Sequence, residues 1–116
     1  MKMYIAVLDT VPDFIAPTLV AHAVLGHHLE VYKNHHAYEI AETEYEQLYS
    51  KWLENSFKKV TLRVNQKEFD KIAALPNVGL FHENKTLDRK KSCAVIVVDN
   101  DVPNVLQYAK MWSPVK

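Results

Sequence analysis

The stretch YIAVL at residues 4–8 is apolar at every position and rich in residue types that favour strands. Asp9, Thr10 and Pro12 follow it, and these residue types commonly end a strand. An apolar run without alternation indicates a strand that is covered on both faces. CAVIVVD at residues 93–99 has the same character. Two such strands separated by helical segments predict an α/β domain with a partly parallel sheet between helical layers.

Two helices are expected between the first strand and the next one. Residues 17–32 form the first, and the polar segment at residues 33–40 is expected to be an irregular connection. Apolar residues recur at spacings of three and four from residue 39 onward, which predicts a second, amphipathic helix over residues 39–50. Thr43 with Glu46 resembles a capping pair within this segment.

The second half of the chain alternates short strands and helices. The expected elements are a half-exposed strand at residues 60–64, a helix capped by Asn65 and Glu68 and ended by Pro76, a strand at residues 78–83, the strand at residues 93–99, and a last helix at residues 102–112 capped by Asp101. The predicted order is therefore β-α-α-β-α-β-β-α.

Composition limits the class of protein. The chain has 116 residues, of which 48% are hydrophobic, and this size fits one domain over residues 1–116 with a single core. Lysine plus arginine and aspartate plus glutamate each number 14, so an RNA partner needs a local basic patch. Cys93 is the only cysteine, which excludes an intrachain disulfide and suits a reducing compartment. With no signal-like or membrane-spanning run in the sequence, we expect a cytoplasmic protein without membrane partners.

LVAHAVLGHH at residues 19–28 places three histidines in the first helix. At about 100° per residue, His22, His27 and His28 point to different sides of a helix. They therefore lack the shared face that a helical zinc site needs, and we expect no metal. His22 lies between two alanines and is expected to be buried, bonded to backbone or orienting a ligand. His27 and His28 are expected to form the solvated polar end of the helix.

Other catalytic signatures are weak. Cys93 begins an apolar strand, where packing in the core is its simplest role. Gly26 and Gly79 are the only glycines, so a GxSxG nucleophile elbow and the phosphate-binding glycine loops are both absent from the sequence. We expect no bound cofactor.

Basic side chains gather in two places that could bind phosphate. One is the turn KTLDRKK at residues 85–91, which contains Lys85, Arg89, Lys90 and Lys91. The other is at the half-exposed strand, which contains Arg63 and directly follows Lys58 and Lys59. The sequence leaves open the alternative that the turn is a solvated loop that protects a strand edge from pairing.

The element order, with VAHA at residues 20–23 and KKVTLRV at residues 58–64, resembles the type 2 peptidyl-tRNA hydrolases and their uncharacterised relatives. The resemblance covers nearly the whole chain in element order and rests on short motifs. It implies a three-layer α/β/α sandwich on a four-stranded mixed sheet and a homodimer. It also implies hydrolysis of the ester that joins a peptide to tRNA.

The resemblance implies where a site would lie. The Gly-Lys pair of the family corresponds to Phe14 and Ile15, so its lysine is missing here. His22 belongs to VAHA, and Glu83 and Thr86 lie near the family's aspartate and threonine. The candidate catalytic residues are thus His22, Glu83 and Thr86. The candidate ligand-binding residues are Asp9, Asp13, Lys85, Arg89, Lys90 and Lys91.

Three functions fit these observations. The first is a binding protein for RNA, such as tRNA, or for a nucleotide-like ligand, with a hydrolase fold whose catalytic site is lost or altered. The second is an active peptidyl-tRNA hydrolase with a rebuilt site. The third is a protein-interaction or inhibitor domain that uses the aromatic surface of the second helix, with Tyr38 or Tyr49 as its main contact.

Overall fold

The computed structural model describes residues 1–38, 43–82 and 90–113, and the side chains of residues 33–38 are outside this description. The described strands form one mixed sheet in the order β3-β4-β1-β2-β5. Their bounds are β1 (Lys2–Leu8), β2 (Lys59–Val64), β3 (Gly79–Phe81), β4 (Cys93–Val98) and β5 (Lys110–Met111). β1 and β2 are parallel, whereas the other neighbouring pairs are antiparallel. The two apolar runs are therefore adjacent inner strands, as predicted.

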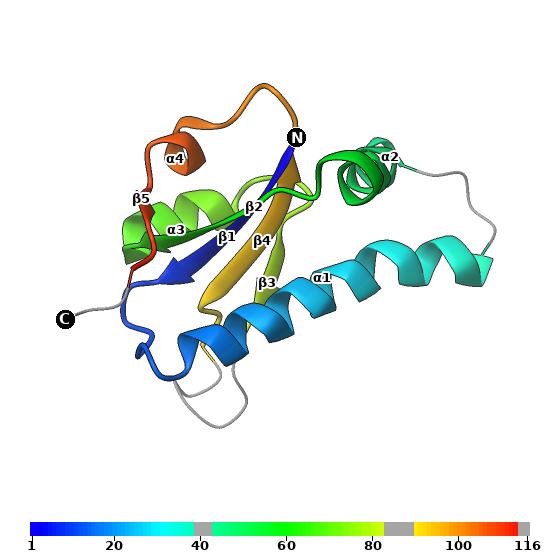
Figure 1. The fold of residues 1–116 in the computed structure, drawn as a ribbon. Coiled ribbons are helices and arrows are strands. Elements are labelled where there is room, and N and C mark those ends of the chain that lie inside the picture. The colour runs from blue at the N-terminus through cyan, green and yellow to red at the C-terminus, as the bar shows by residue number, and fades with distance from the viewer. Residues whose placement is uncertain (39–42, 83–89, 114–116) are drawn as a thin grey trace.

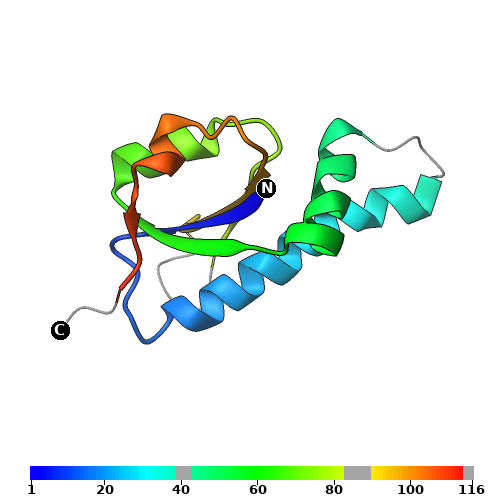
Figure 2. The ribbon, with the colours of Figure 1, turned by 45° about the horizontal axis from the view of Figure 1, so that its top comes forward.

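Helices lie on both faces of the sheet (Figures 1 and 2). Their bounds are α1 (Ala16–Tyr38), α2 (Glu44–Lys51), α3 (Gln66–Ala73) and α4 (Asn104–Gln107). α1 packs on β1, β3 and β4, whereas α3 and α4 lie together on the opposite face. This arrangement explains why β1 and β4 are buried along almost their whole length. Within the described residues, none of the helices has the length and hydrophobicity needed to cross a membrane.

The end of the chain differs from the prediction. The sheet has five strands rather than four, because residues 110–111, expected to be helical, form β5 and pair with Leu62 and Arg63. The last helix is confined to α4, and its N-cap is Pro103 rather than Asp101. The pairing partner of β5 lies far away in the sequence, so the local apolar spacing of residues 102–112 could not reveal it.

The helix boundaries are partly as predicted. α1 continues to Tyr38, where an irregular connection was expected from residue 33. Thr43 is the N-cap of α2, and its hydroxyl accepts a hydrogen bond from the Glu46 N–H at 3.1 Å. Asn65 and Glu68 form the full capping box of α3. The caps predicted for α2 and α3 are therefore confirmed, and residues 39–42 of the predicted second helix lie outside the described part.

The orientation of α1 reverses the expectation for its histidines. The buried side chains of α1 include Leu19, Ala23, His27 and Val31, which recur every four residues on one face. His27 is only 2% exposed, whereas His22 lies outside this row and is exposed. The predictions of a buried His22 and a solvated His27 are therefore wrong, because apolar neighbours in sequence do not define the inner face of a helix.

Candidate functional site

His22 is the one predicted catalytic residue that the structure describes. Its exposed ring on α1 makes an edge contact with the ring of Phe81, with centroids 6.1 Å apart. Glu83 and Thr86 lie outside the described residues. The predicted catalytic set therefore stays a prediction.

The loop between β1 and α1 offers no cation where the family resemblance implies a lysine. Ile15 is buried in the core, whereas Phe14 is 81% exposed. Asp9 is exposed, and the carboxylate of Asp13 accepts a 2.8 Å hydrogen bond from the guanidinium of Arg63. Asp13 is thus engaged by an ion pair within the protein, and ligand binding by Asp9 and Asp13 stays a prediction.

The basic turn is described only at its end. Lys90 and Lys91 are both exposed, and Lys91 Nζ lies 3.4 Å from the carbonyl oxygen of Leu80. Lys85 and Arg89 lie outside the described residues. Phosphate binding at this turn stays a prediction.

The described residues do form a site along β2. Lys59, Thr61 and Arg63 share one face of this strand, as the sequence alternation predicts. Two apolar clefts lie beside α1. The first separates the start of α1 from Thr61 and Trp112, and the second separates α1 from α2, Phe57 and Lys59. The polar face of β2 therefore borders both clefts.

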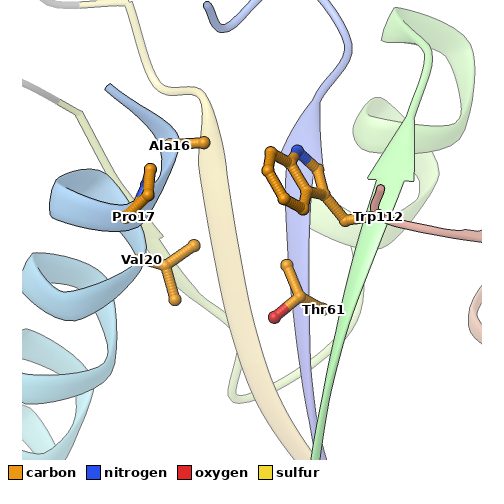
Figure 3. Close-up of a pocket in the computed structure, with 5 residues that line it drawn as sticks. All are labelled: Ala16, Pro17, Val20, Thr61 and Trp112. Carbon is orange, nitrogen blue, oxygen red and sulfur yellow. The ribbon is translucent and has the colours of Figure 1, made fainter. Parts of the chain in front are cut away.

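The first cleft, which we call the Trp112 cleft, has a volume of about 230 Å³. Figure 3 shows Trp112 and Thr61 on one side and the first turns of α1 on the other. Its lining residues are Ala16, Pro17, Val20, Thr61 and Trp112. Within the described residues, the buried indole N–H of Trp112 has no hydrogen-bond partner. The cleft thus combines apolar walls with one unused donor beside it.

Trp112 is fixed by contacts with β2 and Arg63. Its backbone N–H donates a 2.9 Å hydrogen bond to the carbonyl of Thr61. The Arg63 guanidinium lies 5.1 Å from the centroid of the Trp112 ring and donates a 2.8 Å hydrogen bond to the carbonyl of Ser113. A cation near an aromatic ring is attracted by the negative ring face. Arg63 therefore orients the indole that borders the cleft.

The second cleft, which we call the Phe57 cleft, has a volume of about 270 Å³. Its walls are mainly apolar and aromatic, and the lining residues are Ala21, Val24, Leu25, His28, Tyr49, Trp52, Leu53, Phe57 and Lys59. Lys59 Nζ lies 3.2 Å from the ring centroid of Phe57 and donates a 2.6 Å hydrogen bond to the carbonyl of that residue. A cation and an exposed aromatic ring thus lie together at this cleft.

An irregular backbone presents Phe57. α2 continues into a π-helix, η1 (Trp52–Ser56), and π-helical turns are often found at functional sites. Phe57 follows it with a φ of 55°, a left-handed conformation that costs a bulky residue about 1–3 kcal/mol. Trp52 anchors the segment, because its indole N–H donates a 2.7 Å hydrogen bond to the carbonyl of Lys58. The result is a phenyl ring that is 55% exposed.

Two residues of the site were missed at the sequence level. The alternation at residues 59–63 identified the cationic face, but nothing marked Phe57 or Trp112 as its aromatic neighbours. The sequence also predicted Tyr49 as a contact for a protein partner. Tyr49 is only 1% exposed and its hydroxyl lies 3.1 Å from His28 Nδ1, so its ring is not offered to a partner on the surface. The side chain of Tyr38, the other expected contact, is outside the described part.

Two further observations concern other chemistries. Cys93 is buried as predicted, and burial raises the pKa of its thiol to about 12. In the parts of the chain that the structure describes, no group of three or more His, Cys, Asp or Glu side chains is arranged to hold a metal ion.

No protein-family model matches the chain, and no curated protein matches it. The functional interpretation therefore rests on the geometry along β2.

Proposed function

We propose that this chain is a non-catalytic binding protein for the single-stranded end of an RNA, such as tRNA, or for a nucleotide-like ligand. The protein would use a three-layer α/β/α fold related to that of the type 2 peptidyl-tRNA hydrolases. The observation that carries the proposal is the face of β2, where Lys59, Thr61 and Arg63 lie between the aromatic rings of Phe57 and Trp112.

The chemistry of this face matches that of single-stranded nucleic acid. Proteins bind single strands with positive charge along the backbone and aromatic rings against the bases. Lys59 supplies an ammonium beside the exposed ring of Phe57, and the Trp112 cleft supplies apolar walls. Each cleft is smaller than the usual range of about 300–1,000 Å³ for drug-sized ligands, which favours single ring systems.

The charge of the whole chain agrees with a local site. Lysine plus arginine and aspartate plus glutamate are equal at 14 each, so non-specific attraction of nucleic acid is weak. We expect binding that depends on the aromatic rings and that loses affinity with salt.

Removal of the indole of Trp112 is expected to weaken binding of a short, fluorescently labelled single-stranded RNA, measured by anisotropy at low salt. Trp112→Ala should raise the Kd about 10-fold or more, because stacking of one base on an aromatic side chain contributes about 1–3 kcal/mol. Trp112→Phe should retain most of the affinity. Lys59→Gln should reduce the slope of log K against log salt by about 0.7, the value for one phosphate contact on a single strand.

Tyr108→Ala is the matched control, because Tyr108 is 77% exposed, follows α4 and lines neither cleft. Equal losses in the Tyr108 and Trp112 variants, or no binding by the wild-type protein, would overturn the proposal. Circular dichroism should show that each variant remains folded.

Incubation with peptidyl-tRNA tests the hydrolase alternative, and we expect no release of free tRNA above the rate without protein.

A homodimer is the partner that we propose on the basis of the family resemblance. One large apolar side chain of α1, Leu29, lies outside both clefts and is 57% exposed. Exposed apolar surface of this kind is common at interfaces. Light scattering after size exclusion should give the mass of a dimer, and Leu29→Glu should shift it toward the monomer. A monomeric wild-type protein at all concentrations would contradict the proposal.

A further inference from the structure

His27 takes part in a buried hydrogen-bond chain that joins α1, α2 and β4. The hydroxyl of Tyr45 accepts a 2.9 Å hydrogen bond from the backbone N–H of Val97. The same hydroxyl lies 2.7 Å from His27 Nε2. Because it already accepts from Val97, we assign its own proton to this second hydrogen bond, with Nε2 as the acceptor. The imidazole therefore carries its hydrogen on Nδ1. Burial, assisted by the nearby His28, lowers the pKa of His27 to about 4, so the ring is neutral at physiological pH.

The Nδ1–H group of His27 has no hydrogen-bond partner within the described residues, although the side chain is almost fully buried. Its neighbour is the carboxylate of Glu30, whose Oε2 lies 3.7 Å from Nδ1, beyond hydrogen-bond length. A β-carbon added to Gly79 would lie 2.5 Å from Nδ1. The imidazole ring can therefore occupy this position only because residue 79 has no side chain. The unused donor thus lies beside Gly79 and near the carboxylate of Glu30.

A recess of about 300 Å³ opens at this place. Its lining residues are His27, Glu30, Val31, Thr43, Tyr45, Glu46, Asn77 and Val78. Two of them are carboxylates, and none of the described lining residues is a lysine or an arginine. The Glu46 carboxylate also accepts a 3.2 Å hydrogen bond from the Thr43 hydroxyl, which holds it at the start of α2. The recess is therefore acidic, with apolar walls from the two valines and the tyrosine ring.

We propose that this recess binds a small alkylammonium ion. The ammonium group lies between the carboxylates of Glu30 and Glu46, and the alkyl chain packs against Val31 and Val78. Attraction to the ammonium draws Glu30 inward, which brings its Oε2 within hydrogen-bond distance of His27 Nδ1–H. Binding thus satisfies the buried donor that is unpartnered without the ligand.

The site is separate from the face of β2 proposed to bind RNA. The recess is lined from α1 by His27, Glu30 and Val31, whereas the Phe57 cleft is lined from α1 by another set of residues, Ala21, Val24, Leu25 and His28. Failure of one proposal would therefore leave the other unaffected.

Titration of the ¹⁵N-labelled protein with butylammonium chloride, followed by NMR, tests the proposal. We expect saturable shifts of the backbone amides of Glu46 and Val78 and a shift of the His27 Nδ1–H signal. Tetramethylammonium chloride at equal ionic strength and neutral 1-butanol should not reproduce these shifts, since the first cannot donate hydrogen bonds and the second has no charge.

Glu30→Gln should weaken butylammonium binding about tenfold or more, equivalent to the loss of about 1.4 kcal/mol. The side chain of Glu30 is 58% exposed, so this variant is expected to fold normally. Glu54→Gln is the control, because Glu54 is an exposed glutamate that does not line the recess. The proposal is overturned if butylammonium gives no saturable shift, if tetramethylammonium gives the same shift, or if Glu30→Gln and the wild-type protein bind equally.

Discussion

Acidification from pH 6.5 to pH 4 is expected to remove about 3 kcal/mol of folding stability through His27 alone. Burial holds the pKa of His27 at about 4 in the folded protein, against an ordinary value of 6.5. Between these values the unfolded chain binds more protons than the folded one, so the free energy of unfolding falls as the pH falls. Well above pH 6.5 the imidazole is neutral in both states and its contribution is constant. Urea denaturation at a series of pH values measures this dependence.

Two histidine variants separate this effect from other titrations. His27→Gln should flatten the pH dependence between pH 6.5 and pH 5, where most carboxylates are ionised in both states. It should also lower stability at pH 7, because Tyr45 loses the imidazole that accepts its hydroxyl proton. His22→Gln should retain the wild-type dependence, since His22 is exposed. Equal pH profiles for the wild-type protein and His27→Gln would show that His27 is not the responsible group.

Ile15→Ala is expected to destabilise the protein by about 2–5 kcal/mol, the usual cost of truncating a buried isoleucine. Ile15 is 8% exposed and joins the first loop to the core cluster. Phe14→Ala removes a larger side chain, yet it should change stability by about 0.5 kcal/mol or less, because exposed positions contribute little. Phe14 is 81% exposed. Thermal or urea unfolding of both variants measures the difference.

The contrast between these neighbours bears on function. Similar losses in the two variants would contradict the placement of Ile15 in the core. If Ile15 anchors the loop, a lysine at this position would have to bury its charge or displace the loop. By the family resemblance, this position corresponds to the family's lysine. Its structural role here agrees with the binding function that we propose.

Local patterns in the sequence were sufficient for several elements. The continuous apolar runs of β1 and β4 predicted their burial on both faces, and the structure places them side by side at the centre of the sheet. Asn65 and Glu68 predicted the start of α3 because both bonds of a capping box lie within a few residues. The alternation along β2 likewise predicted its cationic face. In each case the interactions that define the element are local or depend only on burial.

The histidines show where local patterns fail. His22 and His27 both lie in one helix, and the flanking alanines favoured His22 as the buried one. Contacts with β3, β1 and β4 select the face that contains Leu19, Ala23 and His27 instead. Such contacts join segments that are distant in sequence, so the residues next to each histidine in the sequence cannot reveal them.

The sequence by itself determined the α/β class, the central strands, the N-caps of α2 and α3 and the basic alternation on β2, because periodicity and capping are encoded within a few residues. Tertiary structure alone decided that residues 110–111 form a fifth strand, which places Trp112 beside Arg63. It also decided that His27 is buried next to Glu30. Sheet edges and helix faces are chosen by the packing of distant segments, and both proposed sites depend on that packing.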